Sequence, residues 1–125
     1  MTAAKKTPQQ RGKRNRQRGQ EHERDVCAAF TKLLGQKVTR KLGQERDSGS
    51  DIHVGPLVIE CKRRTSIGVI GKWLDQAEAD TNRNAGKVPC VVARSDARPS
   101  VITMALSDFL MLITHAMVKG VDLWE

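Results

Sequence analysis

Three charged residues, Asp51, Glu60 and Lys62, lie close together in the sequence, in a segment that should form a pair of strands. Residues 50–62 read SDIHVGPLVIECK, with Asp51 before a Gly-Pro turn and Glu60 and Lys62 after it. The stretch LVIECK begins as a buried strand and then becomes charged. Two carboxylates and an ammonium near one strand end are the groups that bind a divalent cation and a phosphate. The spacing of these residues across the turn decides whether they can meet.

A two-residue turn at Gly55-Pro56, with glycine first, predicts a type II′ hairpin. In that register Asp51 faces Glu60, so both carboxylates project from the same side of the sheet. Lys62 lies two residues beyond Glu60 and points to that side as well. Opposed like charges destabilise a sheet, and Lys62 alone is a poor match for two carboxylates.

A bound Mg²⁺ would offset these charges, because proteins hold Mg²⁺ with one or two carboxylates, waters and substrate phosphates. The chemistry that suits such a site is phosphodiester hydrolysis, in which the metal lowers the pKa of a bound water. Lys62 could orient or deprotonate that water, or stabilise charge on the phosphate oxygens. The backbone carbonyl of Cys61 is a further candidate ligand. The competing interpretation is a solvated hairpin end, with Lys62 as an ordinary salt-bridge partner.

A third carboxylate comes from a helix predicted over residues 19–34. Val26, Phe30 and Leu33 form an apolar stripe at helical spacing. Extended back by one turn, the stripe reaches Glu23, whereas Glu21 points elsewhere. Glu23 is therefore expected on the buried side, either as a site residue that permits a second metal or as a stripe-edge residue paired with a lysine.

The remaining elements follow from periodicity and turn signals. Strands are predicted over residues 36–42, 51–54, 57–62, 88–93 and 100–106, and helices from Ile70 up to the segment 82–86 and over 108–118, with Ser107 as N-cap. The order α-β-β-β-α-β-β-α predicts one α/β domain with a central mixed sheet flanked by helices. The last helix is apolar enough to carry a homodimer interface, with core packing as the equal alternative.

The charge is large and uneven. The 125 residues carry a net charge of +8, and residues 1–24 hold eight Lys and Arg against two Glu. We expect residues 1–16 to be a flexible basic arm that binds the phosphate backbone of a nucleic acid, and residues 17–125 to be the folded domain; a tail that only aids solubility is the alternative. The chain has no Tyr, which disfavours base stacking on single strands. Without a signal peptide or a long apolar run, a cytoplasmic location is expected.

These motifs resemble the PD-(D/E)XK nuclease superfamily, and most closely the archaeal-type Holliday junction resolvases and related phage endonucleases. Arg18-Gly19 through Glu23-Arg24-Asp25, then Ser50-Asp51-Ile52, then Ile59-Glu60-Cys61-Lys62 carry the resemblance. Ser50 stands where the nominal motif has proline. The resemblance covers roughly residues 16–95.

The resemblance implies a restriction-endonuclease-like core and a Mg²⁺-dependent endonuclease, with Mn²⁺ as a substitute and one or two ions per site. It implies Glu23, Asp51 and Glu60 as metal ligands and Lys62 as the catalytic lysine. The expected DNA contacts are Arg11, Lys13, Arg14, Arg16, Arg18, Arg40, Lys41, Arg46, Arg63, Arg64 and, from the helix after the motif, Gln76.

The best candidate substrate is four-way or otherwise branched DNA, cut by a homodimer in a bacterial, phage-infected or archaeal cytoplasm. Two alternatives stay open. One is a nuclease for nicks, ends or mismatches on the same fold. The other is a DNA-binding protein that kept the fold and lost turnover.

Overall fold

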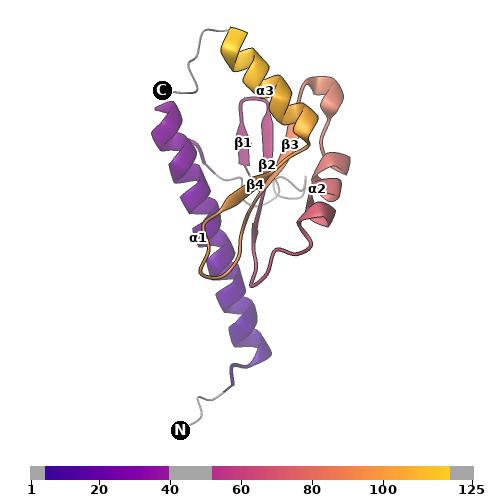
Figure 1. The fold of residues 1–125 in the computed structure, drawn as a ribbon. Helices are drawn as coiled ribbons and strands as arrows, with labels where there is room; N and C mark the ends of the chain where they lie inside the picture. Colours follow the sequence, from indigo (N-terminus) through magenta and orange to yellow (C-terminus); the bar gives the residue numbers. More distant parts are fainter. Residues whose placement is uncertain (1–4, 40–51, 119–125) are drawn as a thin grey trace.

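The computed structural model describes residues 5–39 and 52–118 as a single sheet with helices packed around it (Figure 1). The elements are α1 (Pro8–Leu34), β1 (Ile52–Val54), β2 (Leu57–Arg63), α2 (Ile70–Ala79), the 3-10 turn η2 (Arg83–Ala85), β3 (Val88–Arg94), β4 (Val101–Thr103) and α3 (Leu106–Val118). The sheet order is β1-β2-β3-β4, with β2 and β3 parallel and both outer pairs antiparallel. This is the mixed sheet flanked by helices that the sequence predicts.

The hairpin of β1 and β2 has the predicted register. Ile52 pairs with Ile59, and Val54 pairs with Leu57 across the turn. Gly55 has a φ of 54°, in the left-handed region that glycine adopts without steric cost. The turn chemistry therefore sets which residues of β2 face each side of the sheet.

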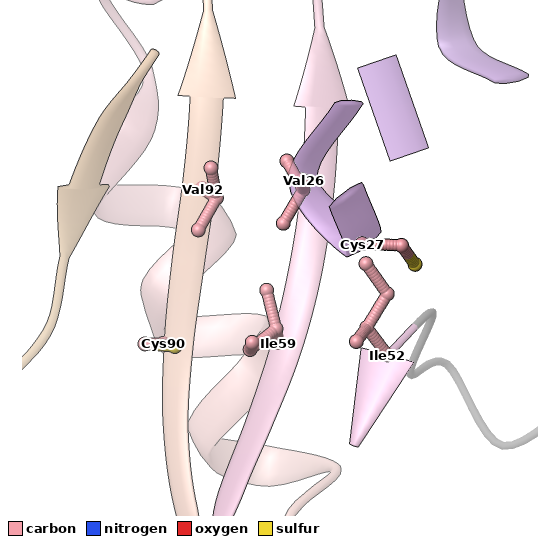
Figure 2. Packing of buried hydrophobic residues seen from close by; sticks show 6 residues of the cluster. All are labelled: Val26, Cys27, Ile52, Ile59, Cys90 and Val92. Carbon is pink, nitrogen blue, oxygen red and sulfur yellow. The ribbon is translucent and has the colours of Figure 1, made fainter. Parts of the chain in front are cut away.

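Helices α1 and α2 bury two separate clusters on the sheet. Figure 2 shows the first cluster, where Val26 and Cys27 of α1 lie over Ile52, Ile59, Cys90 and Val92 of the sheet. The second cluster joins Ala77 of α2 to Val91 and Ala93 of β3. Since adjacent residues of β3 contribute to different clusters, β3 is buried on both faces, as expected for a central parallel strand.

Helix α1 begins at Pro8, eleven residues before the start that the sequence predicts. The Thr7 side chain accepts a hydrogen bond from the Gln10 backbone, and the Gln10 side chain accepts one from Thr7, forming a capping box with Pro8 at the first helical position. Most of the basic arm is thus helical. The sequence prediction missed it because residues 8–18 have strong helix propensity but no apolar stripe.

The strand predicted over residues 36–42 does not form in its described part, residues 36–39. Helix α1 ends at Gly35, and the Val38 backbone N–H then donates to the Thr31 hydroxyl at 2.9 Å. Val38 packs on the first cluster from a loop. The apolar character of this residue therefore reflects a loop contact with the core instead of strand alternation. Residues 40–42 lie outside the described part.

The C-terminal helix starts at Leu106, so Ser107 is inside it and is not its N-cap. The Ala105 carbonyl accepts hydrogen bonds from the backbone of Asp108 and Phe109. The buried Asp108 carboxylate accepts hydrogen bonds from both Arg83 Nη atoms, at 3.1 and 3.0 Å. These hydrogen bonds raise the pKa of the Arg83 guanidinium above its usual value. The predicted strand over 100–106 is only Val101–Thr103. No helix in the described ranges has the length and apolar character to cross a bilayer.

Ile59 is fully buried, whereas Ile102 on β4 is 54% exposed. We expect Ile59→Ala to lower the free energy of unfolding by about 2–5 kcal/mol, because it removes buried methyl groups and leaves a cavity. Ile102→Ala should change it by no more than about 0.5 kcal/mol. Urea unfolding of both variants measures the difference, and equal effects would contradict the assignment of β2 to the core.

Candidate active site

The end of β2 presents a charged pair beside the hydrophobic core. Ile59 and Cys61 point to the first cluster, so the intervening Glu60 and the following Lys62 point to the other side of the strand. Lys62 Nζ lies 3.2 Å from Glu60 Oε1, and each side chain is 19% exposed. The two residues therefore form a mostly buried ion pair at a fixed position on a strand. The Cys61 side chain packs on the core.

Glu23 comes from α1, which packs on the Ile59 face of β2, opposite to the face toward which Glu60 and Lys62 point. Its side chain lies on the stripe that continues to Val26 and Cys27, and it is 5% exposed, whereas Glu21 is exposed. This confirms the prediction that Glu23, and not Glu21, is on the buried side of the helix. A carboxylate buried to this extent needs a cation or hydrogen-bond donors close by.

One pocket of about 250 Å³ brings these groups together. It is lined by Glu60, Cys61, Lys62, Arg63 and Arg64 of β2 and the following turn, and by Arg16, Gly19, Gln20 and Glu23 of α1. In the described residues β1 pairs with β2 no further than Ile59. The pocket thus lies where α1 passes the charged end of β2, and both elements supply acidic and basic groups to it.

Asp51 lies outside the described residues, as do three of the expected DNA contacts, Arg40, Lys41 and Arg46. The structure does describe the residue that follows Asp51. This residue, Ile52, pairs with Ile59, which precedes Glu60. Gln76 is exposed on α2 and does not line the pocket that contains Glu23 and Glu60.

The described donor set suits a hard divalent cation. Two acidic residues, Glu23 and Glu60, line one pocket together with Cys61. Within the described ranges no three His, Cys, Asp or Glu side chains form a metal-binding group. Mg²⁺ fits such a partial set, because it is usually held by one or two carboxylates and completes its shell with waters and phosphate oxygens.

The expected basic contacts divide into two groups. Arg11, Lys13, Arg14 and Arg16 are exposed on the first half of α1, the helix whose N-terminal end extends past the sheet (Figure 1). Arg18, Arg63 and Arg64 lie closer to the sheet, and Arg63 and Arg64 also line the acidic pocket. Burial, together with repulsion from Arg18 and Arg94, lowers the pKa of Arg63 below its usual value. Cationic side chains are therefore crowded next to the carboxylates.

Sequence reasoning missed two residues that organise this region. His22 is 2% exposed, and its Nε2 donates to the Val92 carbonyl at 3.1 Å, which fastens α1 to β3. Its spacing of four residues from Val26 places it on the apolar stripe and is a signal that could have found it. Asp96, after β3, forms ion pairs with Arg18 and Arg63. Asp96 has no local signal, because Arg18 lies 78 residues away in the sequence.

If Glu23 belongs to a metal site, Glu23→Gln should weaken Mn²⁺ binding by about tenfold or more, because the amide removes a charged ligand. Glu21→Gln is the matched control, because Glu21 lies two residues away on the same helix but is exposed. This variant should bind Mn²⁺ like the parent chain. Titration calorimetry or Mn²⁺ electron paramagnetic resonance measures both. Equal affinity of the two variants would remove Glu23 from the metal site.

Comparison with known proteins identifies the family of this chain. Residues 14–121 match the model of a protein family described as "Phage putative PDDEXK endonuclease". The searches of curated proteins and of solved structures give no match. The matched segment spans most of the chain and includes Glu23, Asp51, Glu60 and Lys62. The chain therefore belongs to this phage family of PD-(D/E)XK endonucleases.

Proposed function

We propose that this protein is a Mg²⁺-dependent, structure-selective DNA endonuclease that hydrolyses phosphodiester bonds in branched DNA in the cytoplasm of the phage-infected host. The observation that carries the proposal is one pocket whose lining includes buried Glu23 of α1 together with Glu60 and Lys62 of β2, which form an ion pair. Family membership supports endonuclease chemistry on DNA. The metal, the branched substrate and the residue roles are the parts that we add.

In this proposal Glu23, Asp51, Glu60 and the Cys61 carbonyl hold the metal, which when bound lowers the pKa of a water and polarises the phosphate. We include Asp51 in this proposed set of ligands because of its position in the sequence, directly before Ile52. The Glu60 carboxylate also holds Lys62 Nζ at 3.2 Å, so the ammonium is positioned before substrate arrives. Lys62 then stabilises the negative charge that develops on the phosphate oxygens.

The basic residues of the proposed DNA surface lie on both sides of this pocket. Arg16 lines it from α1, and Arg63 and Arg64 line it from the end of β2. The exposed basic turns of α1 continue away from the sheet (Figure 1). These side chains contact phosphates without reading bases, which suits recognition of DNA by shape.

We also propose a homodimer, because two-strand cleavage at a symmetric branch needs two active sites. In the described part of the chain, Leu110, Met111 and Met117 of α3 and Ile102 of β4 are more than half exposed, and Phe109 is 48% exposed. Ile102 and Phe109 also line one apolar pocket with Leu106, Leu112 and Ile113. Exposed apolar surface of this kind is typical of a protein interface.

Asp51→Asn tests the catalytic assignment. We expect Mg²⁺-dependent cleavage to fall by at least about 100-fold, since even the outer partners of metal ligands contribute about 10- to 100-fold. DNA binding in the presence of a chelator should stay within about twofold. Asp75→Asn, an exposed position on α2 with the same charge change, is the control. Normal cleavage by Asp51→Asn would remove Asp51 from the site.

A cleavage panel tests the substrate. Duplex, nicked, flap and four-way DNA of one sequence set are compared with Mg²⁺ and with a chelator. We expect the four-way junction to be cut at least about tenfold faster than duplex, because shape recognition is built from contacts to the backbone. Faster cutting of nicked or end-containing DNA would favour the alternative nuclease on the same fold. Binding of DNA without cleavage of any substrate would favour an inactive DNA-binding protein.

A further inference from the structure

A second pocket lies next to the candidate active site and has a different chemistry. It has a volume of about 400 Å³ and is lined by Asn15, Arg16, Arg18, Arg63, Arg64 and Thr65. Four of these six residues are arginines and none is acidic. It lies between α1 and the end of β2 and shares Arg16, Arg63 and Arg64 with the pocket of Glu23 and Glu60.

One carboxylate outside this pocket holds two of its arginines in place. Asp96 Oδ1 accepts hydrogen bonds from Arg18 Nη2 and from Arg63 Nη1, the latter at 2.8 Å. The Arg63 side chain is only 12% exposed, and its Nη1 also donates to the Arg64 carbonyl at 2.9 Å. Asp96 thus links α1 to the end of β2 through a shared oxygen.

The turn that carries Asp96 is itself tightly specified. Ala97 has a φ of 59°, in the left-handed region that is sterically unfavourable for an L-residue. The Arg98 backbone donates to the Ser95 carbonyl at 3.4 Å, and Arg94 Nε donates to the Arg98 carbonyl at 2.9 Å. A non-glycine residue held in this region marks a backbone that its surroundings constrain, often at functional sites.

Arg64 is positioned from another direction. Its guanidinium lies over the Trp73 ring, 5.7 Å from the centroid, and its Nη1 donates to the Arg63 carbonyl at 3.0 Å. Three of the four arginines therefore have a defined partner. The entropy cost of ordering them has been met before any ligand binds, which favours tight recognition of an anion.

The positive charges in this pocket are only partly compensated by acidic side chains. Four guanidinium groups line this pocket, and the Arg63 side chain is only 12% exposed, so the positive charges repel one another with little screening by water. Asp96 is half-exposed and is shared by two arginines, so it compensates only part of this repulsion. A phosphate would add the missing negative charge and offer its oxygens to the guanidinium forks.

We propose that this arginine pocket binds a backbone phosphate of the DNA other than the one that is cleaved, and that Asp96 is the positioning residue of the pocket. The shared walls place that phosphate beside the candidate active site, and in this respect the inference rests on the proposed function. Holding a second phosphate on the same DNA would fix the direction in which the backbone crosses Glu60 and Lys62.

Asp96→Asn gives a test in which the two interpretations predict opposite signs. If Asp96 is only one acidic group near DNA, its neutralisation should tighten binding, because the protein becomes more basic. If Asp96 positions Arg18 and Arg63, binding should weaken by about fivefold or more despite the added positive charge. The measurement is the Kd for a labelled duplex in chelator, by anisotropy, with Asp75→Asn as the charge-matched control. Binding as tight as or tighter than that of the control would overturn the proposal.

Arg18→Lys provides a second test that does not depend on the turn. It keeps the charge but loses the planar fork, so we expect binding about threefold or more weaker. Arg24→Lys, exposed on the same helix and outside this pocket, should bind DNA like the parent chain. Equal Kd values for the two lysine variants would contradict the proposal.

These measurements do not depend on turnover, so the two proposals fail separately. A chain that cleaves no DNA, yet shows weaker binding in Asp96→Asn and in Arg18→Lys, keeps the phosphate pocket and loses the proposed activity. A chain that cleaves DNA, while both variants bind like their controls, keeps the activity and loses the pocket.

Discussion

The alternation of side chains along β2 is the constraint on which the rest of the structure depends. A strand sends successive residues to opposite faces, so burying Ile59 under α1 determines the side to which Glu60 and Lys62 point. A slip of one residue in the β1–β2 hairpin would exchange the core and site faces. The Gly55-Pro56 turn prevents this slip, and the same strand therefore supplies both the core and the candidate site.

Helix α1 links the basic surface to that site because one continuous helix carries both. Arg16, Gly19 or Gln20, and Glu23 recur at helical spacing, and all line the acidic pocket. The second half of the helix is fixed by Val26 and Cys27 in the core and by the His22 bond to β3. The first half depends on its capping box and on residue propensity. A rigid core contact thus orients an exposed basic segment.

In the described part of the chain, several acidic residues serve as internal partners of the abundant cations. Asp108 accepts two hydrogen bonds from the Arg83 guanidinium, which links α3 to the turn before β3. Asp96 accepts hydrogen bonds from Arg18 and Arg63, which links α1 to the end of β2. These pairs are long-range, because Asp96 lies 78 residues from Arg18 and Asp108 lies 25 residues from Arg83. They allow a chain with a net charge of +8 to keep arginines close together. The crowding that remains beside Glu60 and Lys62 favours a polyanionic ligand.

The sequence by itself determined the features that depend on near neighbours: the hairpin register, the buried strand over residues 88–93, the mixed sheet, and the buried position of Glu23. Turn chemistry and periodicity act over a few residues, so they can be read directly. The same reasoning placed a strand over residues 36–42, although Val38 reaches the core from a loop, and it began α1 too late because caps and propensity leave no apolar pattern. Only the tertiary structure brought Glu23 to the Glu60–Lys62 pair and Asp96 to Arg18. Those contacts join segments far apart in the chain, and their geometry follows from how α1 packs on the sheet, which no local pattern encodes.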